Sequence, residues 1–277
     1  MKKHLSTIII IIILLTGLSL LLYPTVSDYW NSFHQSQAIA EYEEVVANLD
    51  NDLYKELWER AVAYNEALSE KPNRYYLSSE EYEDYNSQLD VSGTGIMGYV
   101  EIPCINCRLP IYHGTDEGIL QIAVGHIVSS SLPVGGEGTH CVLSGHRGLP
   151  SAKLFTNLDE VEEGDVFFLK VLDETLAYEV DQIRIVLPEE VSELEFVEGM
   201  DYCTLVTCTP YGINTHRLLV RGHRIENEEE FFEPRVTSDA IQLNPKYTIL
   251  ALVVPVLVIL LIGLLIYYGR KKQNKGE

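Results

Sequence analysis

The sequence predicts a mainly β protein, an antiparallel barrel or sandwich at residues 92–225, with a helical region before it and two flanking transmembrane helices. Short apolar runs separated by glycine, proline or acidic turns follow one another in the second half of the chain, as in barrels and sandwiches. An apolar stripe at helical spacing precedes them. The chain has a mean hydropathy of +0.02 despite 41 acidic side chains, because its apolar residues are concentrated at the two ends.

The composition excludes several classes of protein. A hydrophobic content of 46% excludes intrinsic disorder, and 277 residues with five cysteines exclude a small disulfide-rich protein. The net charge of −21 and a pI of about 4.7 argue against nucleic acid as a partner, because an acidic surface repels phosphate.

The first apolar segment, residues 5–22, contains no charged side chain and is long enough to cross a bilayer as a helix. A cleavable signal peptide is the alternative, since Lys2 and Lys3 resemble its basic beginning. The apolar run exceeds the roughly 7–15 residues typical of signal peptides. We therefore expect a transmembrane anchor at residues 1–24.

The second apolar segment, residues 247–268, is also uncharged, with tyrosines at both ends and a basic tail, residues 269–277, after it. A buried core helix is the alternative. Basic residues lie outside both spans, which by the positive-inside rule puts both termini in the cytoplasm. The sequence thus predicts a two-pass protein of the cell membrane with an extracellular domain between the spans.

The helical region, residues 25–91, contains one long predicted helix at 36–68. Its apolar residues recur at steps of three and four, including Ile39, Tyr42, Val46 and Leu49. We expect this stripe to dock on the domain that follows, with a coiled coil as the alternative. Residues 69–90 are polar and rich in tyrosine, which predicts an exposed connecting segment.

Seven apolar runs predict strands in the β-domain, and several alternate, so that every second side chain faces a core. They are residues 96–102, 109–112, 141–144, 166–172, 178–187, 202–207 and 218–221. Residues 226–246 contain consecutive glutamates and a proline, and we interpret them as a linker to the second span.

Cys208 is the cysteine best placed for chemistry. With five cysteines in an extracellular domain, at least one thiol stays unpaired. Cys208 follows a strand-like run and precedes a turn, where a substrate can reach it. His146, after another strand, and Arg217, in the strand that follows the turn, are candidate partners. By spacing alone, an inert buried cysteine remains open as the alternative.

Residues 204–208, Thr-Leu-Val-Thr-Cys, resemble the TLxTC signature of the sortases, the cysteine transpeptidases of Gram-positive cell surfaces. The similarity continues through residues 209–222. Residues 98–103, 109–114 and 144–150 resemble the same family in the same order. The two spans and the Pro-Tyr-Gly loop at 210–212 resemble class C, the pilin polymerases.

The resemblance implies a closed β-barrel with the active site at one end. It implies Cys208 as the nucleophile, His146 as the general acid/base and Arg217 as the cation beside the scissile carbonyl. These roles suit the chemistry: a free thiol with a pKa near 8.5 needs a nearby cation to ionise, imidazole titrates near neutral pH, and a guanidinium keeps its charge. No cofactor and no metal are implied.

The resemblance also implies the substrate. Sortases cleave a sorting motif of the Leu-Pro-x-Thr-Gly (LPxTG) type on surface proteins between Thr and Gly, and in class C a pilin lysine resolves the acyl-enzyme. A cell-wall-anchoring sortase using a peptidoglycan-precursor amine is the first alternative. A non-enzymatic surface adhesin is the second.

Two further expectations concern the lid and the other cysteines. Class C sortases resemble one another in a lid with an Asp-Pro-aromatic motif, which this sequence lacks, so we expect a modified or missing lid at residues 69–76. Cys104 and Cys107 form a C-x-x-C without a second pair for zinc, and we interpret them as small core residues. Cys141 and Cys203 lie in apolar strands and are also expected in the core.

Overall fold

The computed structural model describes residues 2–226. The chain divides into two units, Met1–Phe231 and Phe232–Glu277, and the described residues belong to the first of them. The predicted second span and basic tail, and all but the first residue of the predicted linker, lie outside the described residues.

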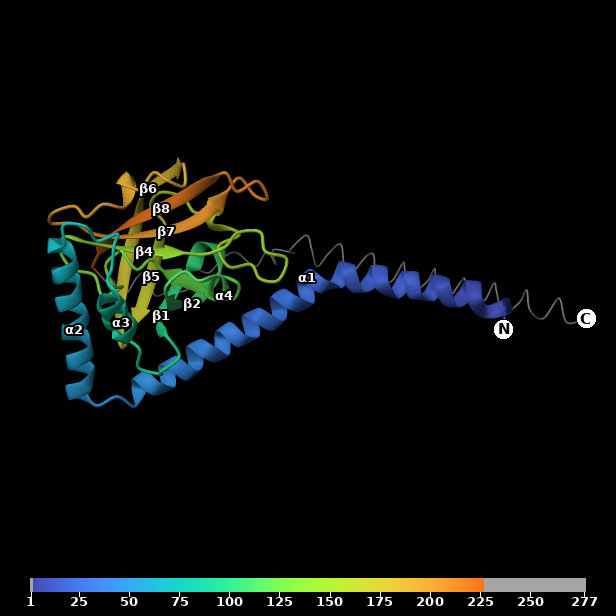
Figure 1. The fold of residues 1–277 in the computed structure, drawn as a ribbon, viewed down its shortest axis with the longest axis horizontal. Helices are drawn as coiled ribbons and strands as arrows, with labels where there is room; N and C mark the ends of the chain where they lie inside the picture. The colour runs from blue at the N-terminus through green and yellow to red at the C-terminus, as the bar shows by residue number, and fades with distance from the viewer. Residues whose placement is uncertain (1, 227–277) are drawn as a thin grey trace, which may run out of the picture. The chain divides into compact units, whose positions relative to one another are not determined.

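Within the described residues, eight strands close into a barrel in the order β1-β2-β3-β4-β7-β8-β6-β5 (Figure 1). The strands are β1 (Ile96–Ile102), β2 (Cys107–His113), β3 (Val124–His126), β4 (Thr139–Ser144), β5 (Val166–Val171), β6 (Glu174–Val186), β7 (Asp201–Thr209) and β8 (His216–Ile225). Seven of them fall on the predicted apolar runs, and the closed barrel is confirmed. Only β3 was missed, because three residues are too few to show a period.

Two strand pairs are parallel, β2 with β3 and β4 with β7, so the expectation of a purely antiparallel sheet is wrong. The alternation of side chains shows which face a residue occupies and carries no information on strand direction. The consequence is functional, because β4 and β7 end at the same edge of the barrel.

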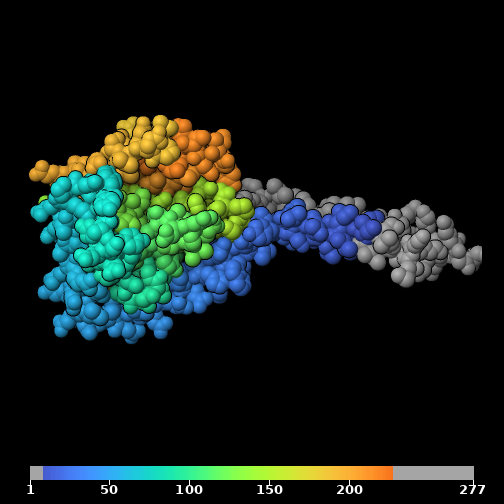
Figure 2. Space-filling model, viewed as in Figure 1, coloured from blue at the N-terminus to red at the C-terminus, as the bar shows by residue number. Residues whose placement is uncertain are grey.

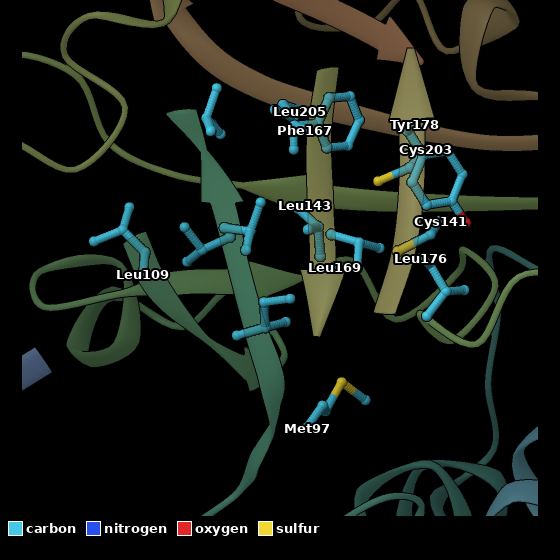
Figure 3. Packing of buried hydrophobic residues seen from close by; sticks show 14 of the residues in the cluster. Met97, Leu109, Cys141, Leu143, Phe167, Leu169, Leu176, Tyr178, Cys203 and Leu205 are labelled. Atoms are coloured by element: carbon cyan, nitrogen blue, oxygen red, sulfur yellow. The ribbon is translucent and has the colours of Figure 1, made fainter. Parts of the chain in front are cut away.

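Side chains fill the barrel interior. Leu143, Phe167, Leu169, Tyr178 and Leu205 are all fully buried and lie between the strands (Figure 3). Each such side chain contributes roughly 1.5–3 kcal/mol by leaving water. An eight-stranded barrel packed in this way has no interior room for a ligand, so chemistry must take place outside it.

The predicted long helix is in fact two. Helix α1 runs from Lys2 to Ala47 and helix α2 from Asn51 to Glu70. The break between the two helices falls at Asp50, whose side chain accepts a hydrogen bond from the Leu53 amide at 2.7 Å and caps the start of α2. The segment Ile9–Ala47 of α1 is long and apolar enough to cross a membrane, with a mean hydropathy of 2.4 in its most apolar window. This finding agrees with an N-terminal membrane anchor.

The apolar stripe of α1 and α2 docks on the barrel as predicted. The Tyr42 hydroxyl donates to the Met97 carbonyl at 2.9 Å and accepts from the Leu172 amide at 2.7 Å. The Asn65 amide group exchanges two hydrogen bonds with the backbone of Leu132, at 2.7 and 3.1 Å. Figure 2 shows α2 and the chain after it covering one flank of the barrel.

A short helix, α3 (Ser79–Ser87), replaces part of the predicted connecting segment. Ser78 and Glu81 form a capping box at its start, a signal that was present in the sequence. Tyr85 of this helix is fully buried, and its hydroxyl lies 2.9 Å from His126 Nδ1 and accepts from the Gly114 amide at 2.9 Å. The helix is therefore anchored to the core through Tyr85 and is not a simple exposed linker.

Candidate active site

The barrel brings the three predicted site residues to one edge. Cys208 near the end of β7 lies directly opposite Arg217 of β8. Ser144, the last residue of β4, lies opposite Val206 in the parallel ladder. His146 is two residues beyond Ser144, as Cys208 is two beyond Val206. Since neighbouring strands are about 4.8 Å apart, Arg217 lies beside Cys208, and the β4–β7 ladder leads the chain toward His146 on the other side of β7.

Two hydrogen bonds extend the β4–β7 ladder to the histidine. The Gly145 amide donates to the Val206 carbonyl at 3.0 Å, and the buried Thr207 hydroxyl donates to the Gly145 carbonyl at 2.8 Å. A Cβ added to Gly145 would lie 2.6 Å from the Phe155 ring, so only glycine fits here. The backbone is thus held up to the residue before His146.

The three candidate side chains are half-buried, and two of them share the outer face of the sheet. Cys203 and Leu205 pack inside the barrel, so strand alternation turns Val206 and Cys208 to the outer face of the sheet. Arg217 pairs with Cys208 and shares that face. Its Nη1 donates to the carbonyls of Asn214, in the β7–β8 connection, at 3.3 Å and of His216, the first residue of β8, at 3.0 Å.

Arg147 connects the histidine loop to the cysteine strand. Its side chain is only 9% exposed, Nη2 pairs with the Asp159 carboxylate, and Nη1 donates to Thr209 Oγ1 at 3.4 Å. The Tyr211 ring lies 5.8 Å from the Arg147 guanidinium and packs on Gly148, where a Cβ would lie 2.9 Å away. Sequence reasoning missed these contacts, although Arg147 adjoins the predicted histidine.

An apolar cluster lies on the same outer face. It consists of Val142, Val206 and Leu219, with Leu194 among the residues packed against it, and we refer to it as the outer apolar cluster. Leu194 belongs to the short helix η3 (Ser192–Leu194) in the β6–β7 loop, residues 187–200. The loop therefore covers the sheet face that leads to Cys208.

His140 lies farther down this face and has a structural role. It is 1% exposed, with Nε2 2.7 Å from Thr204 Oγ1 and Nδ1 3.0 Å from the Glu195 carbonyl. His126 is also fully buried. Loss of hydration lowers the pKa of His140 to about 4, despite the hydrogen bond to the Glu195 carbonyl.

The lowered pKa of His140 predicts a loss of stability in acid. The unfolded chain binds a proton at this histidine below about pH 6.5, whereas the folded protein does so only near pH 4. The free energy of unfolding should therefore fall by roughly 2–3 kcal/mol between pH 7 and pH 4.5 through this group. Urea denaturation of wild type and His140→Gln at both pH values checks this. An equal decline in both proteins would contradict it.

The remaining cysteines divide into two kinds. All five thiols are free. Cys141 and Cys203 are buried side by side in the β4–β7 ladder, which confirms their assignment to the core. Cys104 is exposed and Cys107 half-buried, so the interpretation of this C-x-x-C as a core pair is wrong. The short helix η1 (Pro103–Ile105) carries Cys104 around the β1–β2 turn, at the barrel surface.

The segment at residues 69–76 contacts the β6–β7 loop. Arg74 and Tyr75 both bond to the side chain of Glu195. Tyr75 is 51% and Tyr76 75% exposed. A modified or missing lid stays a prediction.

The Sortase domain family model matches residues 100–225. Sortase D of Bacillus subtilis is 34% identical over 131 residues, which are 46% of this chain and 63% of that protein, less than two thirds of its length. Sortase A of Staphylococcus aureus is 27% identical over 182 residues, 64% of this chain and 84% of that protein.

Solved structures match over a longer stretch. Sortase C1 of Streptococcus agalactiae is 52% identical with a TM-score of 0.68, and the match covers 69% of this chain and all of that one. Sortase C of Streptococcus pneumoniae is 46% identical with a TM-score of 0.63, covering 69% and 97%. The chain therefore belongs to the sortase family of cysteine transpeptidases, and its structural relatives include class C sortases.

Proposed function

We propose that this protein is a membrane-anchored class C sortase that joins pilin subunits, with Cys208 as the nucleophile, His146 as the general acid/base and Arg217 as the oxyanion-stabilising cation. The observation that supports the proposal is the register of β4, β7 and β8, which pairs Cys208 with Arg217 and pairs Val206 with Ser144, two residues before His146. No cofactor or metal takes part in the proposed reaction.

The reaction begins with attack of the Cys208 thiolate on the carbonyl carbon of the Thr–Gly bond in an LPxTG-type motif. Arg217 donates hydrogen bonds to the oxygen that becomes negative. Protonated His146 gives its proton to the departing glycine amine as the C–N bond breaks, which leaves a thioester on Cys208. A pilin lysine amine then attacks the thioester, loses a proton to His146, and releases the thiolate with formation of an isopeptide bond.

The apolar cluster on the sheet face near Cys208, with the β6–β7 loop packed over it, is an argument for an apolar peptide substrate. An extended Leu-Pro-x-Thr segment spans about 13 Å, which is also the length of β7 from Cys208 back to Thr204. Val206 lies midway on that face and packs with Val142 and Leu219. Because the cluster itself is buried beneath the β6–β7 loop, the leucine and proline of a sorting motif would pack against that loop while the threonine carbonyl reaches Cys208.

The proposed topology has two passes with both termini in the cytoplasm and the barrel outside. The apolar part of α1 supports the first anchor. The second anchor, at residues 247–268, rests on its uncharged sequence and the basic tail after it. This arrangement puts the active site where secreted pilins and other surface proteins arrive.

Class C activity is favoured over cell-wall anchoring by the structural relatives. One of them, the Streptococcus pneumoniae sortase C structure, is described in terms of pilin substrate specificity. The alternative function is attachment of surface proteins to a peptidoglycan-precursor amine, which the similarity to sortase A of Staphylococcus aureus does not exclude. The two functions share the first half of the reaction and differ in the amine.

Mass spectrometry of the acyl-enzyme tests the proposal. Full-length protein in membrane vesicles is incubated with an LPxTG-type peptide, and the thioester is trapped in acid and mapped. The expected adduct ends in threonine and lies on Cys208. Adding either a lysine-bearing pilin domain or a peptidoglycan-precursor amine then shows which one removes it. An adduct on another cysteine, or none, would overturn the proposal.

A further inference from the structure

We propose that Arg74 and Tyr75, between α2 and α3, form a strut that holds the β6–β7 loop over the outer apolar cluster and thereby sets the binding surface for the peptide. The proposal rests on the proposed function and adds two positioning residues to it. Neither residue is predicted to touch the reacting atoms.

The strut consists of four contacts to three consecutive loop residues. Arg74 Nη1 lies 2.7 Å from Glu195 Oε2, and Nη2 donates to the Leu194 carbonyl at 3.1 Å. The guanidinium lies 4.1 Å from the centroid of the Phe196 ring, a cation–π contact. The Tyr75 hydroxyl donates to Glu195 Oε1 at 2.8 Å. Backbone, carboxylate and aromatic ring of the loop are thus all held by two adjacent residues.

The Arg74 contacts are strong for a surface segment, because the side chain is only 12% exposed. An ion pair with one partner withdrawn from water is screened less than a fully exposed pair. The hydrogen bond from Tyr75, followed by the ion pair with Arg74, lowers the pKa of Glu195, so the carboxylate stays ionised and the pair intact at neutral pH. Arg74 Nε is buried without a hydrogen-bond partner among the described residues, a cost that the loop contacts offset.

The other side of the loop rests on the sheet. The Glu195 carbonyl lies 3.0 Å from His140 Nδ1, and the Leu194 side chain packs against the outer apolar cluster. Residues 194–196 therefore lie between the strut and the strands. Apart from the three-residue helix η3, this loop has no regular secondary structure of its own between β6 and β7, so its position depends on these contacts.

Arg74 and Tyr75 lie too far from Cys208 to act as a lid over its thiol. Glu195 and Thr204 both contact His140, which puts the strut level with Thr204. Thr204 is four residues from Cys208 on the same strand, about 13 Å away. The strut thus acts on the part of the face where the peptide would lie and leaves the thiol open. Its removal should weaken peptide binding without exposing Cys208 further.

The experiment uses the full chain in membrane vesicles and compares Arg74→Gln with the control Lys71→Met. Lys71 lies in the same segment and pairs with Glu81 of α3 at 2.6 Å, and within the described residues it makes no ion pair with the loop. For Arg74→Gln we expect the KM for an LPxTG-type peptide to rise roughly tenfold, equivalent to about 1.4 kcal/mol. We expect kcat and the rate of Cys208 alkylation by iodoacetamide to stay within about twofold. The control should leave all three unchanged.

Two further variants keep the test decisive. Tyr75→Phe removes a single hydroxyl and should raise KM by a smaller factor, so it replaces Arg74→Gln if that protein fails to fold. Arg74→Gln and Glu195→Gln combined should be only slightly worse than Arg74→Gln alone, because the two substitutions share the Arg74–Glu195 ion pair. Faster alkylation and higher turnover in Arg74→Gln would instead identify a lid, and an unchanged KM would exclude a strut. Failure of the wild type to form an acyl-enzyme would count against the proposed function and not against the strut.

Discussion

Replacing Cys208 with alanine should reduce transpeptidation by at least about 10⁴-fold and abolish the covalent acyl-enzyme. The reason is that no other thiol can replace it. Cys141 and Cys203 are sealed in the barrel core, and Cys104 and Cys107 lie at the β1–β2 turn, which β3 and β4 separate from β7 around the barrel. Without a thioester, the lysine amine has only an unactivated peptide bond to attack.

The measurement is the pattern of covalent pilin polymers in cells that lack other sortases. The Cys208→Ala strain should show pilin monomers only. Cys104→Ala is the matched control, since Cys104 is a free, exposed thiol outside the proposed site, and its strain should keep the full ladder. Persistent ladders in Cys208→Ala would end the proposal of a cysteine nucleophile, and a non-enzymatic adhesin would then become the leading interpretation.

Replacing Arg217 with lysine should lower kcat/KM by roughly 10²–10³-fold, although the charge is kept. Arg217 lies directly across from Cys208, and its Nη1 is occupied by the carbonyls of Asn214 and His216. These bonds orient the planar guanidinium, whose remaining N–H groups are available to a developing oxyanion. An ammonium has no second nitrogen, so it cannot bind the turn and the substrate with the same geometry.

Arg221→Lys is the control for this substitution. Arg221 lies on the same face of β8, four residues farther along, where Nε and Nη2 bond to the Asp181 carboxylate at 3.0 and 2.8 Å. Its replacement should change stability and leave peptide cleavage within a few-fold. If Arg217→Lys cleaves peptide at a rate similar to that of Arg221→Lys, then Arg217 does not stabilise the transition state.

The local sequence predicted much of the fold where a pattern was long enough. Seven strands, the docked helical stripe and the buried cysteines 141 and 203 all follow from which side chains avoid water. The same reasoning failed where a short polar signal decided the structure. Asp50 ends one helix and starts another, and the capping box at Ser78 and Glu81 starts α3, against an otherwise polar and aperiodic background.

The candidate site was likewise predicted only in part from the sequence. Cys208, His146 and Arg217 were identified from strand ends and family resemblance, and the barrel brings them to one edge. The residues that support the site were not predictable, because Arg147 meets Thr209, and Arg74 meets Glu195, across 62 and 121 positions of the chain. In the sequence alone, an arginine that makes such contacts cannot be distinguished from an arginine on the solvent-exposed surface.

The sequence by itself determined the strands, the apolar N-terminal helix and the identity of the proposed nucleophile, because each depends on residues that are neighbours along the chain. Only the tertiary structure decided that β4 runs parallel to β7, that Arg217 lies beside Cys208, and that the segment at Arg74 contacts the β6–β7 loop. The physical reason is that the strands form a closed barrel. The register of a closed barrel is set by all eight strands together, so which distant side chains meet is a property of the whole sheet and of no single segment.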